Sequence, residues 1–229
     1  MKRKSPTLGE EIVPTKRTKK KIELEELTYA YTGKGSEISN KSYLEICKGR
    51  KEIRGTIKQG CIVDDYVVLW SQNKETEKEI LAEYNMIKEL EKYGLPVVNL
   101  YGIYPINVKG RSTMALVEET LSGNLYKPHD KAIEFTPEVK FQIKNIIDIL
   151  QRNNILIDDF QWMYTPEGLK IIDPFKIYKL DPVTKSYIIL GGEQDKRKQP
   201  YRKLEAAFNK QNENLKRLLD YTTEPMPVY

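Results

Sequence analysis

The sequence predicts an α+β protein in two parts, of which the first is rich in β-strands and the second is mainly helical. Short runs of β-branched and aromatic residues, separated by Gly and Pro, fill residues 23–122. Apolar residues at helical spacing mark 137–153 and about 200–221 within the second part, residues 123–221. A chain of 229 residues is long enough for one large domain or two small lobes to bury a sizeable core.

Composition excludes several classes of site. The chain has one histidine, His129, and two cysteines, Cys47 and Cys61, without metal-ligand spacing, which argues against a zinc site or a serine-histidine triad. We expect reduced thiols in an intracellular protein, with a Cys47–Cys61 disulfide as the open alternative. No run of 18 apolar residues is present, and no apolar segment follows the basic start. We therefore expect neither a membrane partner nor an ordinary secretory signal.

The basic charge is concentrated at the N-terminus. Residues 1–21 carry +6 in a chain whose net charge is +5, so the remainder carries −1. Low apolar content predicts disordered tails at 1–22 and 222–229. Two basic clusters, 2–4 and 16–21, have the spacing of a two-part nuclear localisation signal, which predicts a nuclear import receptor as a partner. A solvated arm, or one that touches RNA or acidic lipid, has the same composition. We expect no nucleic-acid partner except through this tail.

The elements of the first part follow one another in a regular order. We expect strand-like pieces at 27–31, 43–47, 52–58, 66–71 and 96–102. A further stretch, 113–125, is an apolar strand that leads to acidic residues and then to a Gly-containing turn. A charged helix is expected over residues 74–93, because an apolar stripe runs along it and Gly94 to Pro96 ends it. Gly33 to Ser36 form a glycine turn of the kind that lets backbone amides approach a phosphate, and Gly55 to Gly60 offer a second such loop.

Residues 154–178 organise the second part. A helix over 137–153 leads into two apolar runs, 155–157 and 169–172, and each run is followed by aspartate. Thr165 to Gly168 have hairpin-turn chemistry, so we expect the two runs to pair as strands. Two carboxylates at the ends of paired strands can face one cleft, which suits metal-assisted phosphoryl transfer. Two acids that merely cap strands are the structural alternative.

This stretch resembles the catalytic segments of protein kinases. In that family H-R-D-L-x-x-x-N is followed by a short hairpin and a run that ends in D-F-G. The resemblance implies that Asp159 is the catalytic aspartate and that Asp173 holds magnesium with help from Gln161. The chain departs from the pattern at three points. Ile157 stands in place of histidine, the loop is too short for the asparagine, and Pro174 replaces the phenylalanine of D-F-G.

The resemblance extends to the nucleotide-binding part of the first lobe. It implies that Gly33, Gly35 and Ser36 cover the ATP phosphates. It also implies that Glu83, on the helix that resembles αC, pairs with the phosphate-binding lysine.

The lysine itself is displaced in this alignment, which puts Trp70 at its position in V-A-I-K. Lys41 or Lys58 from a neighbouring strand are the candidates, and Lys58 is the one assigned. The backbone from Glu119 to Leu121 resembles the hinge that meets adenine.

Taken together, the order of these segments resembles a minimal, two-lobed protein kinase with a short C-lobe, like those found among bacterial secreted effectors. The resemblance implies a small atypical Ser/Thr kinase that uses ATP and Mg²⁺. It further implies a protein substrate, possible virulence functions and action inside a host cell, including its nucleus. Three alternatives stay open: a pseudokinase that binds a protein partner, a basic nuclear factor that binds nucleic acid, and transfer of AMP instead of phosphate.

Overall fold

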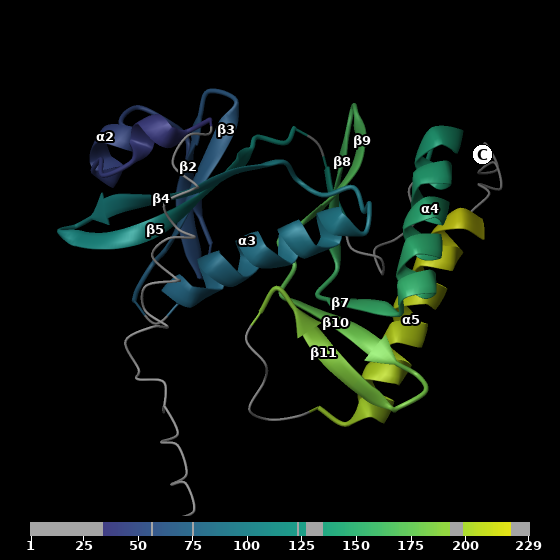
Figure 1. Cartoon of the computed structure of the whole chain (residues 1–229). Coiled ribbons are helices and arrows are strands. Elements are labelled where there is room, and N and C mark those ends of the chain that lie inside the picture. Colours follow the sequence, from purple (N-terminus) through teal and green to yellow (C-terminus); the bar gives the residue numbers. More distant parts are fainter. Residues whose placement is uncertain are drawn as a thin grey trace, which may run out of the picture.

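The computed structural model describes residues 34–55, 57–74, 76–122, 124–126, 135–192 and 199–220. Its architecture is mixed α+β, as the sequence predicts, and combines three β-sheets with long helices (Figure 1). The expected tails, the strand at 27–31, Gly33 and His129 lie outside the described residues. No helix in the part of the chain that the structure describes is long and apolar enough to cross a membrane.

A five-stranded antiparallel sheet with the order β1-β2-β3-β5-β4 forms the first part. Its strands are β1 (Glu52–Arg54), β2 (Lys58–Val63), β3 (Tyr66–Ser71), β4 (Leu100–Val108) and β5 (Arg111–Glu119). Helix α3 (Glu77–Lys92) crosses one face, and η1 (Ser36–Ile38) with α2 (Tyr43–Cys47) covers the other. Successive residues on a strand point to opposite faces. Val68 and Trp70 therefore pack toward α2, whereas Val67 and Leu69 pack toward α3.

The segment 43–47, predicted as a strand, is helix α2. Its N-terminus carries a capping box, in which Ser42 accepts from the helix backbone and Glu45 accepts from the backbone N–H of Ser42 at 2.9 Å. The Ser-x-x-Glu spacing is typical of a helix start. The expectation of free thiols is also wrong, because Cys47 of α2 and Cys61 of β2 form a disulfide with a Cα–Cα distance of 5.7 Å. The bond attaches α2 to the sheet.

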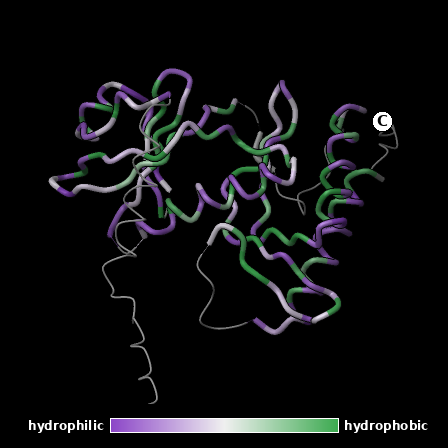
Figure 2. The backbone as a smooth tube through the Cα atoms, viewed as in Figure 1, coloured by the Kyte–Doolittle hydropathy of each residue, from purple (hydrophilic) through white to green (hydrophobic). Residues whose placement is uncertain are grey.

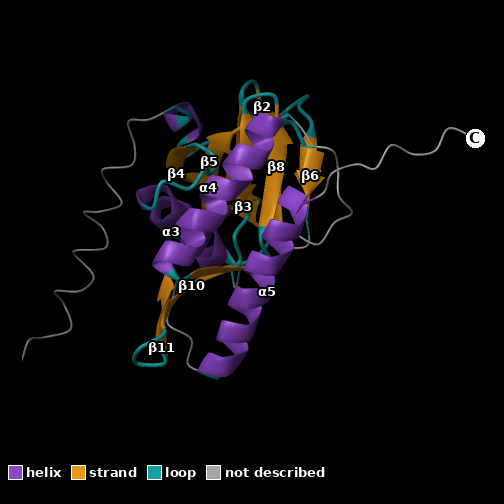
Figure 3. Ribbon diagram, turned by 90° about the vertical axis from the view of Figure 1, so that its right-hand side faces the viewer, coloured by secondary structure: helices purple, strands orange, loops and turns teal. Residues whose placement is uncertain are grey.

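The second part contains more β-structure than predicted. Alongside helices α4 (Pro137–Asn153) and α5 (Tyr201–Asp220), its described residues form six short strands. These are β6 (Asn124–Tyr126), β7 (Ile155–Asp158), β8 (Gln161–Thr165), β9 (Gly168–Ile172), β10 (Lys176–Asp181) and β11 (Ser186–Leu190). They form two three-stranded sheets, β11-β10-β7 and β6-β8-β9. Figure 3 shows α4 and α5 side by side on one side of these strands. The expectation of a mainly helical second part is corrected accordingly.

The two strands that lead to aspartates are not partners of each other. β7 pairs with β10, and β9 pairs with β8, a strand that the local sequence pattern does not predict. The predicted turn at Thr165 to Gly168 is present, but it joins β8 to β9. The two aspartates are therefore brought together by neighbouring sheets and not by one hairpin.

A common core joins the two parts. Met86 and Leu90 of α3 lie in the same buried cluster as Ile146 of α4 and Ile171 of β9. Apolar segments, green in Figure 2, gather along the strands and where the helices meet them. The backbone of residues 96–98 also exchanges hydrogen bonds with Ile171, at 2.7 and 3.1 Å. Helix α3 thus packs on both parts, which fixes its position relative to β2.

Candidate functional site

Three charged side chains from distant segments meet between the two parts. The ammonium group of Lys58, at the start of β2, donates to both carboxylate oxygens of Glu83 on α3 at 2.8 and 2.7 Å. It also donates to Oδ1 of Asp173, which follows β9, at 2.6 Å. Lys58 and Asp173 are 115 positions apart in sequence. The expected pairing of Lys58 with Glu83 is present, and Asp173 joins it.

The turn before Lys58 explains why its side chain lies here. β1 and β2 form an antiparallel hairpin whose turn is closed by a 2.9 Å hydrogen bond from the N–H of Gly55 to the carbonyl of Lys58. Lys58 is the first residue of β2 and, by alternation with Cys61 and Val63, points to the α3 face. The second glycine loop weighed in the sequence, at Gly55, is therefore the one beside the charged cluster.

Burial shapes the charge of these groups. The Glu83 side chain is only 6% exposed, that of Lys58 is 20% exposed, and that of Asp173 is 52% exposed. Burial alone lowers the pKa of Lys58, but the nearby carboxylates of Glu83 and Asp173 outweigh it and raise that pKa. Burial raises the pKa of Glu83, and the Lys58 charge opposes that shift. Lys58 is therefore a permanent cation in this site.

Glu118, near the end of β5, adds a half-buried acid that is not among the predicted site residues. Its Oε2 is shielded from solvent and has no hydrogen-bond partner among the described residues. Burial and then repulsion from Glu83 raise its pKa to about 8, so it is mostly protonated at neutral pH. Residues two apart on a strand share a face, so Glu118 points to the same face of β5 as Leu116, which packs toward α3. An acid at an inward-facing position of an alternating strand is the sequence signal that could have identified it. A charged residue in that inward register is unusual.

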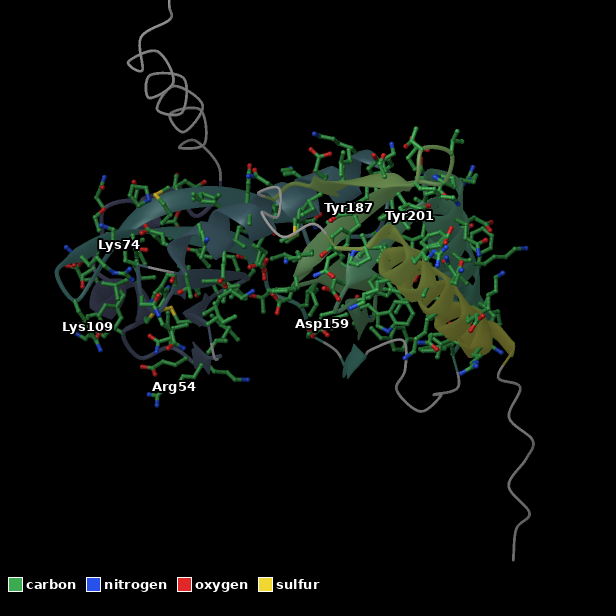
Figure 4. The ribbon with its side chains drawn as sticks, turned by 90° about the horizontal axis from the view of Figure 1, so that it is seen from below. Arg54, Lys74, Lys109, Asp159, Tyr187 and Tyr201 are labelled. Atoms are coloured by element: carbon green, nitrogen blue, oxygen red, sulfur yellow. A yellow bond between two sulfur atoms is a disulfide. The ribbon has the colours of Figure 1, made fainter. Side chains whose placement is uncertain are left out.

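Asp159 and Gln161 lie beside Asp173. The Gln161 amide Nε2 donates to Oδ2 of Asp159 at 2.7 Å. Gln161 also pairs in the β8–β9 ladder with Ile172, the residue before Asp173. Figure 4 shows Asp159 in the middle of the molecule, between the sheet that carries Arg54 and helix α5. The three residues assigned to catalysis and metal binding are therefore neighbours.

Both aspartates have a left-handed backbone. The φ of Asp159 is 49° and that of Asp173 is 47°. Non-glycine residues in this region are uncommon, although aspartate tolerates it better than most, and such backbone is frequent at functional sites. Each aspartate thus turns sharply out of the strand that precedes it. Asp158 stabilises the first turn, because its Oδ1 accepts the backbone N–H of Asp159 at 3.1 Å.

The structure does not bring the predicted glycine turn to this cluster. Gly33 lies outside the described residues. Gly35 has a φ of 85°, and a Cβ built there would meet Cγ1 of Val117 at 2.7 Å. Val117 packs on the α2 face of the sheet, opposite to the face of Lys58. Gly35 and the adjacent Ser36 are therefore on the other side of the sheet from Asp173.

The hinge-like residues have mixed placements. The Glu119 carboxylate accepts the backbone N–H and the side-chain amide of Asn99, each at 2.8 Å, and forms a buried ion pair with Lys170 of β9. The backbone N–H of Glu119 donates to the Asn99 carbonyl at 3.0 Å. Leu121 follows at the half-buried end of this segment. Glu119 therefore ties the two parts together.

Trp70 does not occupy the position of Lys58. It is 3% exposed, packs on the α2 face, and lies 5.9 Å from the Tyr43 ring between centroids. The predicted alignment of Trp70 with the kinase lysine is therefore wrong. The lysine that contacts Glu83 is Lys58 on the neighbouring strand β2, where it pairs with Ser71, the residue after Trp70 on β3. Lys41, the other candidate, lines a separate pocket of about 420 Å³ together with Glu37 and Arg50.

No protein-family model matches this chain, and neither does any curated protein sequence. The site is therefore interpreted from its own residues. It contains a buried Lys–Glu pair, a half-exposed aspartate on the same lysine, and a second aspartate held by an amide. Such an arrangement can bind a phosphate with Lys58 and orient a hydroxyl with Asp159.

Proposed function

We propose that this chain is a small atypical Ser/Thr protein kinase that transfers the γ-phosphate of ATP to a protein hydroxyl. The observation that carries the proposal is the contact of Lys58 with both Glu83 and Asp173. In kinases a lysine on the first-lobe sheet pairs with a helix glutamate and lies near the metal-binding aspartate. Here the lysine comes from β2, and the helix and the aspartate have the expected order along the chain. On this proposal the two parts act as a β-rich N-lobe and a truncated C-lobe.

The roles of the side chains follow from their environments. Lys58, whose charge is permanent, would attract the phosphates and exchange its contact with Asp173 for one with the nucleotide. Glu83 would keep the ammonium group in place, because its own carboxylate is buried on α3. Asp159 would accept a hydrogen bond from the attacking hydroxyl, and Gln161 would keep that carboxylate oriented. Positioning of this kind supplies most of the catalysis in phosphoryl transfer.

The residues present fit magnesium that arrives with the nucleotide. Mg²⁺ is commonly held by one or two carboxylates together with substrate phosphates and water. Asp173 offers a half-exposed carboxylate, and Gln161 offers an amide oxygen beside it. Among the described residues no group of three or more acids, cysteines or histidines could hold a metal alone, which suits a shared site and not a closed cage. The ion would neutralise charge that develops on the phosphate oxygens.

A pseudokinase that binds a protein partner is the second candidate. The placement of Glu119 favours it, because the backbone N–H at this hinge-like position is already bonded to Asn99. Calorimetry separates the two candidates. An active kinase binds Mg-ATP with a heat that Lys58→Met abolishes, whereas a pseudokinase of this kind shows no binding at millimolar nucleotide.

The cellular setting is part of the proposal. The basic residues 2–4 and 16–21 support import into a nucleus, and a short kinase-like chain with such a tail fits an effector that acts on host proteins. A fluorescent fusion tests this directly. Nuclear accumulation should be lost when the Lys and Arg residues of 16–21 are replaced by Gln. If the tail instead binds nucleic acid, affinity should fall steeply with salt and vanish when residues 1–21 are deleted.

Transfer of radiolabel from γ-labelled ATP to a mixture of protein substrates tests the activity. Wild-type protein should label serine or threonine, and Asp173→Asn should lose most of that label. Equal labelling by both proteins would reject the assignment. The same assay with α-labelled ATP detects AMP transfer, which would keep the nucleotide site but change the reaction.

A further inference from the structure

One buried side chain on α5 forms hydrogen bonds with the strand that leads to Asp159. The Gln211 amide donates from Nε2 to the carbonyl of Ile155 at 3.1 Å. Its Oε1 accepts the backbone N–H of Ile157 at 2.8 Å. Gln211 is 7% exposed and lies at the level of β7, whereas the nearby Leu215 is fully buried in the main core. Gln211, a polar residue on the apolar face of α5, therefore has a specific partner in the backbone of β7.

The bonds complete the hydrogen bonding of an edge strand. β7 is the last strand of the sheet β11-β10-β7, so β10 serves only one of its edges. In an antiparallel pair, alternate residues direct both backbone groups to the same side. The Leu180 N–H donates to the Asn154 carbonyl, so the backbone groups of Asn154 face β10. By alternation those of Leu156 and Asp158 face β10 as well. Ile155 and Ile157 face the other way, and Gln211 satisfies one group of each.

An amide is chemically matched to this task. It offers one donor and one acceptor on the same planar group, as a neighbouring strand would. A buried backbone N–H or C=O without a partner is strongly unfavourable, so few other side chains fit. Gln211 thus substitutes for a missing strand over two residues.

The position of Asp159 depends on this edge. Ile157 is two residues before Asp159, and the chain turns to a positive φ immediately after β7 ends. The downstream side is already held, since Gln161 donates to the Asp159 carboxylate, and the turn itself is held by Asp158, whose Oδ1 accepts the Asp159 N–H. The upstream side is held by β10 on one edge and by Gln211 on the other.

We propose that Gln211 is a positioning residue. It fixes where β7 lies against α5 and, through β7, where the carboxylate of Asp159 lies. The catalytic part of this inference rests on the proposed phosphoryl transfer. Gln211 touches neither the hydroxyl nor the phosphate. Its loss should therefore change the rate of the chemical step and leave nucleotide binding intact.

The test replaces Gln211 by methionine, which keeps the shape but has no amide. Asn212→Leu is the matched control, because Asn212 is the adjacent residue, is 5% exposed, and has an Oδ1 without a hydrogen-bond partner among the described residues. We expect kcat to fall by at least about tenfold in Gln211→Met, since a shift of about 1 Å can reduce a rate about a hundredfold. KM for ATP should stay within about twofold, and Asn212→Leu should retain kcat.

Gln211→Glu adds a readout that a merely structural role would not give. A carboxylate can accept from Ile157 but cannot donate to Ile155, whereas the protonated acid can do both. Relative to wild type at each pH, the kcat of Gln211→Glu should therefore recover as the pH is lowered. Unchanged kcat in Gln211→Met, or an equal loss in Asn212→Leu, would overturn the proposal.

A measurement without turnover separates this inference from the proposed function. In Gln211→Met the amide exchange of Ile157 should speed up by at least about tenfold, while that of Leu156, which faces β10, should not change. The NMR order parameter of the Asp159 N–H should fall as well. If the wild type transfers no phosphate, the kinase proposal fails. In that case a lower order parameter at Asp159 supports the positioning role, and an unchanged value overturns it.

Discussion

Replacing Lys58 by methionine removes the cation between Glu83 and Asp173, and the consequence can be worked out from burial. The Asp173 carboxylate is half exposed and can be solvated by water, but the Glu83 side chain is only 6% exposed. Breaking a buried ion pair by removing one partner costs about 3–5 kcal/mol, because the other charge stays buried and uncompensated. Most of that cost should fall on Glu83.

The assay is thermal unfolding followed by circular dichroism. A protein of this size loses about 2–4 °C in Tm for each kcal/mol, so Lys58→Met should melt about 6–20 °C below wild type at pH 7. The loss should be smaller at pH 5. Without Lys58 the pKa of Glu83 rises further, so at lower pH the folded variant holds Glu83 in its protonated, neutral form. Burying the neutral acid costs less than burying the carboxylate.

Two further variants make the result interpretable. Lys92→Met serves as the control, because its pairing with Glu89 on the surface of α3 leaves the lysine 67% exposed, and such pairs contribute less than about 1 kcal/mol. In the double variant Lys58→Met/Glu83→Leu, stability should return toward that of wild type. A Tm of Lys58→Met within about 2 °C of wild type at pH 7 would refute this account of the site.

Three other predictions test the surroundings of the site. The pKa of Glu118 is raised to about 8, so the folded state keeps this proton at pH values where the unfolded state has already lost it. This group alone should therefore lower the free energy of unfolding steadily as the pH rises from about 5 to 8, by up to about 1 kcal/mol per pH unit. Denaturation across that range should show a flatter profile for Glu118→Gln, and parallel profiles for the two proteins would contradict the raised pKa of Glu118. Replacing Cys47 and Cys61 by serine should cost about 3 kcal/mol for a loop of 14 residues, measured as the urea midpoint without reductant, and the reduced wild type should match the variant. Gly191→Ala should destabilise by more than about 2 kcal/mol in the same assay, because its φ is +69° and the new Cβ would lie 2.4 Å from the backbone of α3; Gly110→Ala, with a φ of +81° and open space, should cost only about 1–2 kcal/mol.

Local periodicity was sufficient for the long elements. The helix predicted at 137–153 is α4 with the same bounds, since Pro at its first position and a regular apolar face both mark it. Helix α3 is shorter than predicted by a few residues at its start. The pairing of Glu83 with Lys58 follows from the resemblance to protein kinases and not from periodicity.

Long-range pairing was beyond local patterns. A strand pattern gives the period of a strand and not its partner, so the prediction that β7 pairs with β9 is wrong and its partner is β10. The same limit misplaced Trp70, because a shift of one residue moves a side chain to the opposite face. Gly35 satisfies a turn preference that many loops share, and its distance from Asp173 depends on tertiary packing. Gln211 could not be found either, since its two partners are backbone groups 54 and 56 positions away.

The central claim is tested most directly by mass spectrometry of a protein substrate after incubation with Mg-ATP and either the wild type or Asp159→Asn. Asparagine tolerates the left-handed backbone at this position, so the variant should stay folded while losing its base. The account predicts phosphate addition by the wild type and a rate about 10²–10⁴-fold lower for the variant. Equal phosphate addition by the two proteins, or none by a wild type that is folded and supplied with Mg-ATP, would contradict it.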